Sequence, residues 1–502
     1  MSIRQLAFYS LVASALAGQS LAPPTANPAP PPPAAPAAAA AVSAIKLGKV
    51  TVSGSFRTRQ EAWDWFQPDS GDPSYLYSGN LFRVTFSQSF ESWDWQVELA
   101  VPFLLGLPNN AVAPGAQGQL GLGANYFLAN DRNRNSAMLF PKQAFLQFKA
   151  RGAAHRVKVG RFEFMDGSEL APKNATLAAL KRDRINMRLI GHFGWAHVGR
   201  SFDGVHYSYT KPSGNFTFVG AIPTRGVFQT DGWGETNSAF GYASFTKPWG
   251  KGRHNADTRV FAIHYHDWRQ VLKTDNRPVL LRQADMANIR VASFGGHSLH
   301  ALETKPGTVD VLVWGLGQTG RWGRLDHRAC ALALEAGFQP RIAKRLKPWV
   351  RGGFFRGSGD GDPSDSVHRS FFQILPTPRP FARFPFFNLM NNQDLNAALI
   401  LRPHAKVTVS SEFHALRLAS SRDLWYLGGG VFQPWTFGYA GRATSGNRSL
   451  ANLFDTSVEW RARRDVTLTG YIGYAQGKAV TEFIYPRGRD AKLGYLELMY
   501  RF

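Results

Sequence analysis

The strongest constraint in this chain is an alternation of apolar and polar residues with a period of two, which recurs from about residue 46 to the end. In residues 49–59, Val50 and Val52 share one face of an extended segment, whereas Arg57 lies on the other. Side chains of a β-strand point alternately to its two faces, so this pattern predicts strands with one apolar and one polar face. Residues 492–502 alternate in the same way.

Many segments share this alternation, and together they predict an all-β chain. They are residues 81–90, 95–101, 259–266, 395–402, 454–461 and 466–474. In 259–266, Phe261, Ile263 and Tyr265 oppose His264 and His266, which we interpret as lumen residues. Aromatic residues form 13% of the chain and 49 residues are glycine, a composition typical of strands joined by many turns.

Such strands could build a soluble sandwich or a transmembrane β-barrel, and three features favour the barrel. Arg and Glu at mid-strand suit a wet lumen. Short connections at 91–95 and 151–155 alternate with long ones at 60–79 and 102–142, as expected for short periplasmic turns and long outer loops. Aromatic clusters, at 63–66, 92–95 and 423–426, suggest girdles at two membrane interfaces.

The N-terminal region predicts export from the cytoplasm. Arg4 precedes an apolar run and then small residues, which is typical of a signal peptide over residues 1–22 with cleavage near 17–22. Residues 23–45 are rich in Pro and Ala and predict a periplasmic linker. Residues 46–502 form the predicted barrel, and no later segment reaches the ~20 apolar residues of a spanning helix.

The charge balance indicates polyanionic partners. Lys and Arg number 58 and Asp and Glu 35, which gives a formal net charge of +23. Export counts against nucleic acid, so we expect no nucleic-acid partner. Cys330 is the single cysteine, which excludes a disulfide framework within one chain.

The number of alternating runs predicts roughly 16 to 18 strands, and 18 is preferred with 16 as the alternative. A barrel of this size leaves an aqueous channel unless loops fill it. We expect the last strand to close against the first. The terminal Phe502 resembles the signal by which bacterial outer-membrane proteins reach the barrel assembly machinery.

Cationic side chains dominate the predicted lumen, where rings of Arg attract anions. Arg57, Arg83, Arg188, Arg351 and Arg461 come from separate strands, Arg182, Arg184, Arg379 and Arg383 from segments that could fold inward, and Glu412 and Glu459 stand among them. The alternative is that individual arginines form lumenal ion pairs or bind lipopolysaccharide phosphates from outer loops.

Other candidate sites are weaker. Residues 296–300 lack the final glycine of a nucleophile elbow, so we expect no catalytic site. The two histidines of 259–266 lack a third placed ligand, and the Asp-rich segment 357–366 lacks the glutamate of an EF-hand, so we expect neither a metal nor a cofactor. Residues 171–184 predict a short helix in an outer loop. Trp195, Trp314 and Trp349 are interpreted as girdle residues facing lipid, with sugar stacking as the alternative.

Residues 159–167, 181–209, 371–430 and 483–502 resemble the alginate-export family of outer-membrane barrels. The resemblance implies an 18-stranded monomeric porin with an electropositive constriction, through which an anionic exopolysaccharide leaves the periplasm. The selectivity residues that it implies are Arg57, Arg83, Arg161, Arg182, Arg184, Arg188, Arg369, Arg379, Arg383 and Arg461.

Together these features predict a non-enzymatic channel of the bacterial outer membrane for an anionic polysaccharide or oligosaccharide such as a polyuronate. The alternatives are a general anion-selective porin, and a barrel hydrolase or receptor. Expected partners are the polysaccharide, outer-membrane lipid and lipopolysaccharide, the assembly machinery and a periplasmic export scaffold. We expect a monomer.

Overall fold

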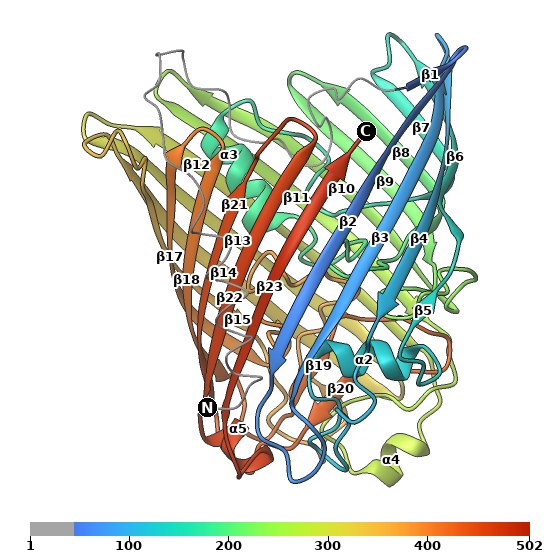
Figure 1. Cartoon of the computed structure of the whole chain (residues 1–502), viewed down its shortest axis with the longest axis vertical. Helices are drawn as coiled ribbons and strands as arrows, with labels where there is room; N and C mark the ends of the chain where they lie inside the picture. Colours follow the sequence, from blue (N-terminus) through green and yellow to red (C-terminus); the bar gives the residue numbers. More distant parts are fainter. Residues whose placement is uncertain (1–44) are drawn as a thin grey trace.

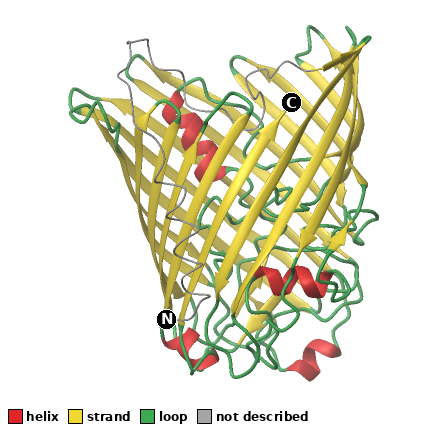
Figure 2. Cartoon of the chain, in the orientation of Figure 1, coloured by secondary structure: helices red, strands yellow, loops and turns green. Residues whose placement is uncertain are grey.

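The computed structural model describes residues 45–502, which form a closed antiparallel barrel of 18 strands (Figures 1 and 2). The predicted signal peptide, and all of the predicted linker except Ile45, lie outside the described residues. The barrel strands are β2 (Val50–Asp64), β3 (Ser74–Ser89), β4 (Trp93–Leu105), β6 (Phe140–Ala150), β7 (His155–Phe162), β8 (Phe202–Lys211), β9 (Gly214–Pro223), β10 (Ser238–Lys251), β11 (His254–Asp267), β12 (Ile289–Glu303), β13 (Gly307–Trp322), β14 (Leu325–Pro340), β15 (Trp349–Gly357), β17 (Asn392–His404), β18 (Val407–Leu418), β21 (Ser449–Trp460), β22 (Val466–Gly477) and β23 (Asp490–Arg501).

Short elements accompany the barrel. The short strands are β1 (Ile45–Leu47), β5 (Ser136–Ala137), β16 (Val367–His368), β19 (Trp425–Gly428) and β20 (Tyr439–Arg442), and the helices are α2 (Leu122–Ala129), α3 (Ala175–Leu180), the π-helical turn η1 (Lys181–Ile185), α4 (Val279–Gln283) and α5 (Ala479–Ile484). None of the helices in residues 45–502 has the length and apolar character that crossing a membrane requires.

The barrel closes where β23 pairs with β2, from Arg501 opposite Ser55 to Lys492 opposite Asp64. Closure leaves the wall without a free edge, as a membrane barrel requires, because lipid offers no hydrogen bonds to an open strand. The predicted barrel class, the preferred number of strands and the closing strand pair are therefore confirmed.

The two ends of the barrel differ. At the turn end, uppermost in Figure 1, neighbouring strands are joined by connections of two to eight residues, such as 212–213, 405–406 and 341–348. At the loop end the connections are long, except for the tight turn between β13 and β14, and they carry all the helices of residues 45–502. Short turns mark the periplasmic side of such barrels and long loops the outer side. The predicted long connection at 60–79 is shorter than expected and covers only 65–73, because β2 and β3 extend toward the loop end.

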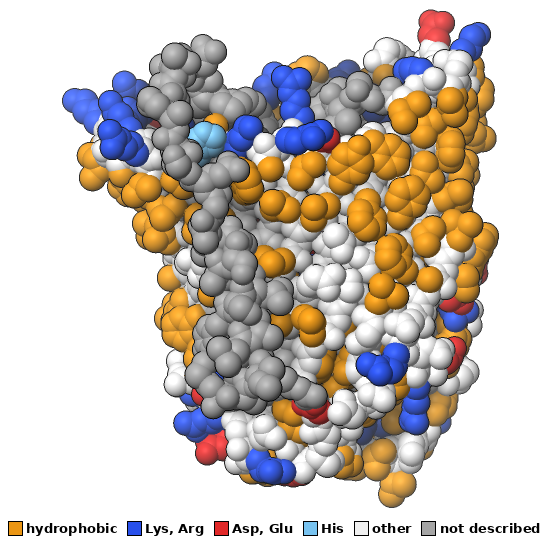
Figure 3. Space-filling model, viewed as in Figure 1, with side chains coloured by type: hydrophobic (Ala, Val, Ile, Leu, Met, Phe, Trp, Pro, Cys, Tyr) orange, Lys and Arg blue, Asp and Glu red, His pale blue; other side chains and the backbone are white. Residues whose placement is uncertain are grey.

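The outer wall is apolar. Val313, Leu332, Phe354 and Leu395 of neighbouring strands are each more than a third exposed and point outward. Figure 3 shows hydrophobic side chains across the visible wall and Lys and Arg gathered along its upper rim. This band suits the hydrocarbon layer of a bilayer, and the charged rim suits its headgroups.

Loops fold back into the barrel from the loop end and build an apolar core there. Residues 163–201, between β7 and β8, and residues 358–391, between β15 and β17, contribute buried side chains that pack against the inner wall. Gly79 of β3 shows how closely they pack, because a Cβ at this position would collide with the ring of His197. The lumen is therefore partly filled by the protein itself.

This inner core reverses one sequence interpretation. Phe261, Ile263 and Tyr265 are buried inside the barrel, and His264 and His266 point outward rather than into the lumen. The inversion has a physical cause. The inner loops present apolar side chains to this stretch of the wall, so the larger apolar side chains of the strand point inward and pack against them.

The predicted aromatic girdle is also only partly correct. Trp314 and Trp349 are fully buried on the inner face, and Trp195 packs inside against Tyr495. The clusters at 63–66 and 423–426 contribute to the inner core, whereas Trp93 and Trp95 lie on the outer wall. Aromatic residues at strand ends can face lipid or pack on loops inside the barrel. The sequence alone does not distinguish these two positions.

Candidate functional site

An inner loop carries three of the predicted arginines into the lumen. Asn174 caps α3 by accepting hydrogen bonds from the backbone N–H groups of Thr176 and Leu177, at 3.0 and 3.1 Å. The helix continues directly into η1, which contains Arg182 and Arg184. The predicted short helix is thus present, but its outer loop folds inside the barrel, where Lys181 binds Asp257 of β11 at 3.1 Å.

Glu335 of β14 gathers three guanidinium groups from two directions. Arg184 of η1 donates from Nε to both carboxylate oxygens, at 3.0 and 2.9 Å. Arg351 of β15 approaches Glu335 at 3.1 Å and also pairs with Asp310 of β13. Arg188 is 3.9 Å away and stacks on the ring of Trp314, with its guanidinium carbon 4.6 Å from the ring centre. We name Glu335, these three arginines and Asp310 the Glu335 cluster.

The opposite wall carries a second group of paired arginines. Arg59 of β2 binds Glu497 of β23 at 2.6 Å, and Arg57 donates to the backbone carbonyls of Gly194 and Ala196. These carbonyls belong to the loop of residues 163–201, so Arg57 fastens that loop to the wall. Burial in a lumen of low polarity favours guanidinium groups that are bonded to carboxylates or carbonyls in this way.

Arg83 of β3 extends this group to the neighbouring strand. It pairs with Glu98 of β4 and, at 3.1 Å, with Glu163 at the start of the inner loop. About a fifth of the Arg83 side-chain surface is exposed, so it remains accessible from the lumen. Arg57 and Arg83 are thus both inward, as the strand alternation predicts.

Two stacked tyrosines join the two groups. Tyr471 of β22 and Tyr495 of β23 lie with ring centres 4.8 Å apart. The guanidinium carbon of Arg59 is 4.7 Å from the ring centre of Tyr495, and that of Arg383 is 5.9 Å from Tyr471. Cations are attracted to aromatic faces, so the two rings lie as a bridge between Arg59 of the wall and Arg383 of the loop 358–391.

Strands β17, β18 and β21 contribute carboxylates to the same part of the lumen. Glu412 lies 3.5 Å from His414, which binds Asp394 at 2.9 Å. Asp455 accepts a hydrogen bond from the backbone N–H of Arg383, while the guanidinium of Arg383 forms no ion pair with any described carboxylate. Arg383 is therefore a lumen cation with capacity for a ligand.

A third cluster lies near the turn end. Arg182 pairs with Asp183 at 2.5 Å, and Arg461 pairs with Glu459 at 3.4 Å. Arg402 of β17 lies within electrostatic range of Arg182, Asp183 and Arg461 and forms no ion pair with a described carboxylate. We name these five residues the mouth cluster. It brings together predicted residues from the inner loop and from the turn between β21 and β22.

Arg379 serves its own loop. Its guanidinium donates to the backbone carbonyls of Arg383, Phe384 and Phe387, at 3.1 Å for the first and 2.8 Å for the last. These bonds fold residues 379–387 into a compact turn, which holds Arg383 beside the wall.

Arg161 lies on the outer face. Its neighbour Phe162 is fully buried on the inner side, so the strand alternation turns Arg161 outward. There it makes a two-bonded pair with Asp203 of β8, at 2.8 and 2.7 Å. The structure therefore does not bring Arg161 together with the lumen arginines.

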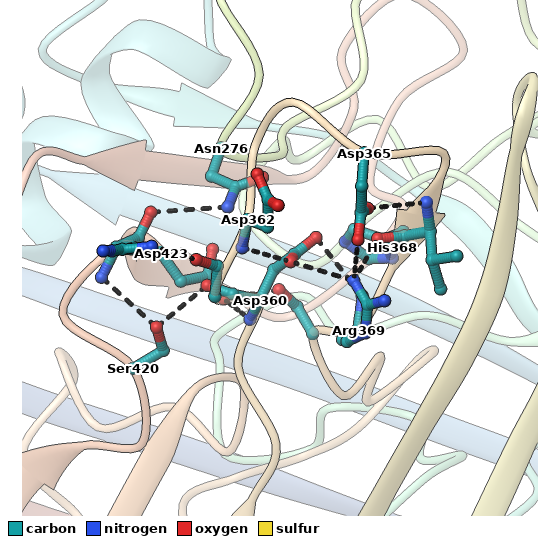
Figure 4. Close-up of polar contacts among 12 residues, drawn as sticks. Asn276, Asp360, Asp362, Asp365, His368, Arg369, Ser420 and Asp423 are labelled. Carbon is teal, nitrogen blue, oxygen red and sulfur yellow. Dashed lines mark hydrogen bonds and ion pairs between the residues drawn. The ribbon is translucent and has the colours of Figure 1, made fainter.

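Arg369 lies in the outer loop between β15 and β17. It binds Asp365 at 2.6 Å, with Asp360 at 3.8 Å, and is well exposed (Figure 4). It is thus also apart from the lumen clusters. Within residues 45–502, no three His, Cys, Asp or Glu side chains are grouped so as to hold a metal ion.

Beside this loop, Asp423 is a buried carboxylate that ties outer loops together (Figure 4). It accepts hydrogen bonds from the hydroxyl of Ser370, the hydroxyl of Tyr426 at 2.7 Å and the backbone N–H of Asp360 at 2.9 Å. Burial raises the pKa of Asp423 to about 6, because desolvation outweighs these hydrogen bonds.

Comparison with known proteins decides the family. The profile of the alginate export family matches residues 117–482, which is most of the chain. The chain belongs to the alginate export family. The predicted resemblance is thereby confirmed.

Solved structures agree with this assignment at the level of the fold. The barrel of this alginate export family member is similar to the outer membrane protein OpdK of Pseudomonas aeruginosa, at 9% identity and a TM-score of 0.53. It is also similar to OccK9 (OpdG) of the same organism, at 10% and 0.54, and to OccAB2 of Acinetobacter baumannii, at 6% and 0.54. Each alignment covers 90% of this chain and 98% of the other. No curated protein sequence gives a significant match.

Family and fold together indicate that the protein is a channel of the bacterial outer membrane. As an alginate export family member, it belongs with transport channels rather than with a known class of enzyme.

Several residues of the clusters escaped sequence reasoning. Glu335 and Asp310 sit on strands of largely apolar sequence, and nothing local distinguishes them from single lumen carboxylates. Arg402 and Arg59 carried a usable signal, because each shares the polar face of a strand with residues that were singled out. The contacts of η1 with β14 depend on how a loop folds, which strand periodicity does not report.

Proposed function

We propose that this protein passes an anionic polysaccharide or oligosaccharide of the polyuronate type across the outer membrane, through an arginine-rich lumen and without chemical change. The observation that carries the proposal is the presence of inward cations on both walls and at the turn end, of which Arg383 and Arg402 have no ion-pair partner among the described residues. Membership of the alginate export family supports the same substrate class.

The chemistry of a polyuronate suits this arrangement. Each sugar ring carries a carboxylate, and a guanidinium group can bind a carboxylate through two parallel hydrogen bonds. The carboxylates of the protein hold most arginines in fixed positions and compete for them, as at Arg184 and Arg83. A ligand carboxylate is then exchanged for a protein carboxylate rather than gripped permanently, and conduction needs sites that are strong enough to enter but weak enough to leave.

The mouth cluster supplies the first step of such a passage. It lies at the periplasmic end, where its positive charges would raise the local concentration of a polyanion. From there, Arg383 and the Glu335 cluster follow along the wall.

A general anion-selective porin is the second candidate. It is favoured by the extensive pairing of the lumen arginines, because Arg57, Arg59, Arg83, Arg184 and Arg351 all have partners within the protein. Pairing reduces the field available to a long polymer but still admits small anions.

Planar-bilayer recordings of the signal-cleaved, refolded protein test the proposal. We expect a reversal potential that indicates anion selectivity under a KCl gradient, and block of the current by an added polyuronate but not by an uncharged dextran of the same length. Anion selectivity without block would favour the general porin, and cation selectivity would overturn both. Polyuronate recovered from the chamber should keep its chain length, since shortening would indicate hydrolysis.

A matched pair of variants locates the effect. Arg383→Gln removes an unpaired lumen cation, whereas Arg161→Gln removes an arginine from the outer face of the same barrel. We expect weaker polyuronate block in the first and unchanged block in the second. Equal effects would contradict a lumenal path past Arg383.

A further inference from the structure

A group of arginines on the outer wall is unexplained by transport. Arg290, Arg321, Arg328, Arg356 and Arg417 are all exposed and come from the strands β12, β13, β14, β15 and β18. We name this group the outer arginine belt. It lies outside the lumen, so the proposed passage does not use it.

The positions of the belt residues in their strands place them near the loop end and facing outward. Arg290, Arg321, Arg356 and Arg417 are each the second residue from the loop end of their strand, and Arg328 is the fourth. Their sequence neighbours are buried inside, so the arginines themselves face the bilayer. Arg290 and Arg321 are also direct partners across β12 and β13.

The belt lies just beyond the apolar band of the wall. On β12, the highly exposed Phe294 lies four residues from Arg290 toward the turn end, and on β15 the exposed Phe354 lies two residues from Arg356. Arginines at this level reach the phosphate groups of lipids, because they lie where hydrocarbon gives way to headgroups.

Four of the five guanidinium groups of the belt form no ion pair with a carboxylate in residues 45–502. The fifth, that of Arg321, pairs with Asp326 at 2.7 Å. Like charges placed side by side repel, as at the directly paired Arg290 and Arg321, unless an anion lies between them. On the other side of the barrel, Ala62 and Leu76 occupy such outward positions on β2 and β3, and the outward cations near the loop end there, Arg161 and Lys492, are paired with Asp203 and Asp64.

We infer that the outer arginine belt binds the phosphate groups of a phosphorylated glycolipid, the lipid A part of lipopolysaccharide, in the outer leaflet. The belt is at the loop end, which faces outward, and its planar guanidinium forks match phosphate oxygens in pairs. Its restriction to one side of the barrel predicts a localised seat rather than a uniform lipid shell.

The test compares two variants with equal loss of charge. The belt variant carries Arg290→Gln, Arg328→Gln, Arg356→Gln and Arg417→Gln. The control variant carries Arg341→Gln, Arg345→Gln, Arg463→Gln and Arg464→Gln, which are exposed arginines of the turn end. Heat-modified mobility on gels verifies that each barrel is folded.

Native mass spectrometry then measures the binding of purified bisphosphorylated lipid A to each full barrel in detergent. We expect binding to be weaker by about tenfold or more in the belt variant, a factor that corresponds to ~1.4 kcal/mol, and nearly unchanged in the control. Equal loss in both variants, or no loss in either, would overturn the inference.

The lipid itself provides a test that needs no variant. Dephosphorylated lipid A should lose most of its affinity for the wild-type barrel, and phosphatidylglycerol should bind less tightly than bisphosphorylated lipid A. Retained binding without phosphates would contradict the belt as the seat. Equal binding of phosphatidylglycerol would contradict the assignment to the glycolipid.

Discussion

Arg184 of η1 donates from Nε to both carboxylate oxygens of Glu335 on β14, at 3.0 and 2.9 Å. This pair joins a loop that enters from the outer side to the middle of the barrel wall. Because Arg188 and Arg351 approach the same carboxylate, one glutamate offsets three positive charges. Glu335 is therefore one of the buried anions that hold the inner loop against the wall, together with Asp257, which binds Lys181 of the same loop.

Replacing Glu335 should destabilise the barrel. In Glu335→Gln, three guanidinium groups lose their shared carboxylate, and removing one partner of a buried pair typically costs about 3–5 kcal/mol. We expect a lower thermal unfolding midpoint in detergent. Glu459→Gln is the control, because its pair with Arg461 is well exposed and should cost only about 0–1 kcal/mol. Equal midpoints for the two variants would contradict a structural role for Glu335.

The mouth cluster should set selectivity at the periplasmic end. In Arg402→Glu, an unpaired cation becomes an anion beside Asp183 and Glu459, so we expect a chloride-to-potassium permeability ratio that is lower by about two- to fivefold at low salt. At 1 M salt, where the Debye length is about 3 Å, the effect should shrink. Arg341→Glu, on an exposed turn of the same end, tests whether any charge reversal there has the same effect. A similar change in that variant would contradict a special role for Arg402.

Asp423 should make the outer loops pH-dependent. Its pKa is raised from 3.8 to about 6 by burial, so its contribution to stability is full below pH ~4 and is lost as the pH rises through 6. The shift corresponds to roughly 3 kcal/mol. Burial also raises the pKa of Asp360, so its contribution to stability is likewise lost as the pH rises. We expect the wild-type barrel to unfold at a lower temperature at pH 7 than at pH 5.

The variant Asp423→Asn separates this effect from other titrations. The amide stays neutral and can still accept hydrogen bonds from Ser370 and Tyr426, so the difference in midpoint between pH 5 and pH 7 should become smaller. Asp362→Asn, at an exposed position of the neighbouring loop, should leave the difference unchanged. An unaltered pH dependence in Asp423→Asn would refute the assignment.

The sequence predicted the wall better than the contents of the barrel. Strand faces follow from a local period, so Arg57, Arg83 and Arg351 were placed on the inner side by simple alternation. The loop positions of Arg369 and Arg379 depend instead on tertiary contacts between distant segments. Arg161 shows a further limit, because a family resemblance transfers a residue type without the strand face it occupies.

The buried aromatic residues show the same limit from the opposite side. Trp314 and Trp349 have the residue type and strand position of a lipid girdle, yet they line the inside, where Arg188 stacks on Trp314 and Trp349 donates to Asp310 at 2.7 Å. An alternation with a period of two shows that the two faces of a strand differ. It does not show which face is the interior once loops make both faces partly apolar.

Arg200 links loops that fill the lumen. It belongs to the loop of residues 163–201 and is fully buried. One of its nitrogens, Nη1, donates to the carbonyl of Val431 at 3.1 Å, and Nη2 donates to those of Pro376 and Gly429 at 3.2 and 2.8 Å. These acceptors lie on the loops 358–391 and 419–448, so one guanidinium joins three loops that fill the barrel.

Removing this link should make the outer half of the lumen easier to open. In Arg200→Met, three buried carbonyls lose a donor, and each unsatisfied group costs about 1–3 kcal/mol. We expect larger or more frequent open-state currents in single-channel recordings, together with faster proteolysis of residues 419–448. Arg200→Lys keeps the charge but has no planar fork to reach all three carbonyls, so it should fall between wild type and Arg200→Met. Wild-type currents in both variants would show that the three loops stay packed without this guanidinium, and that the passage does not depend on their separation at Arg200.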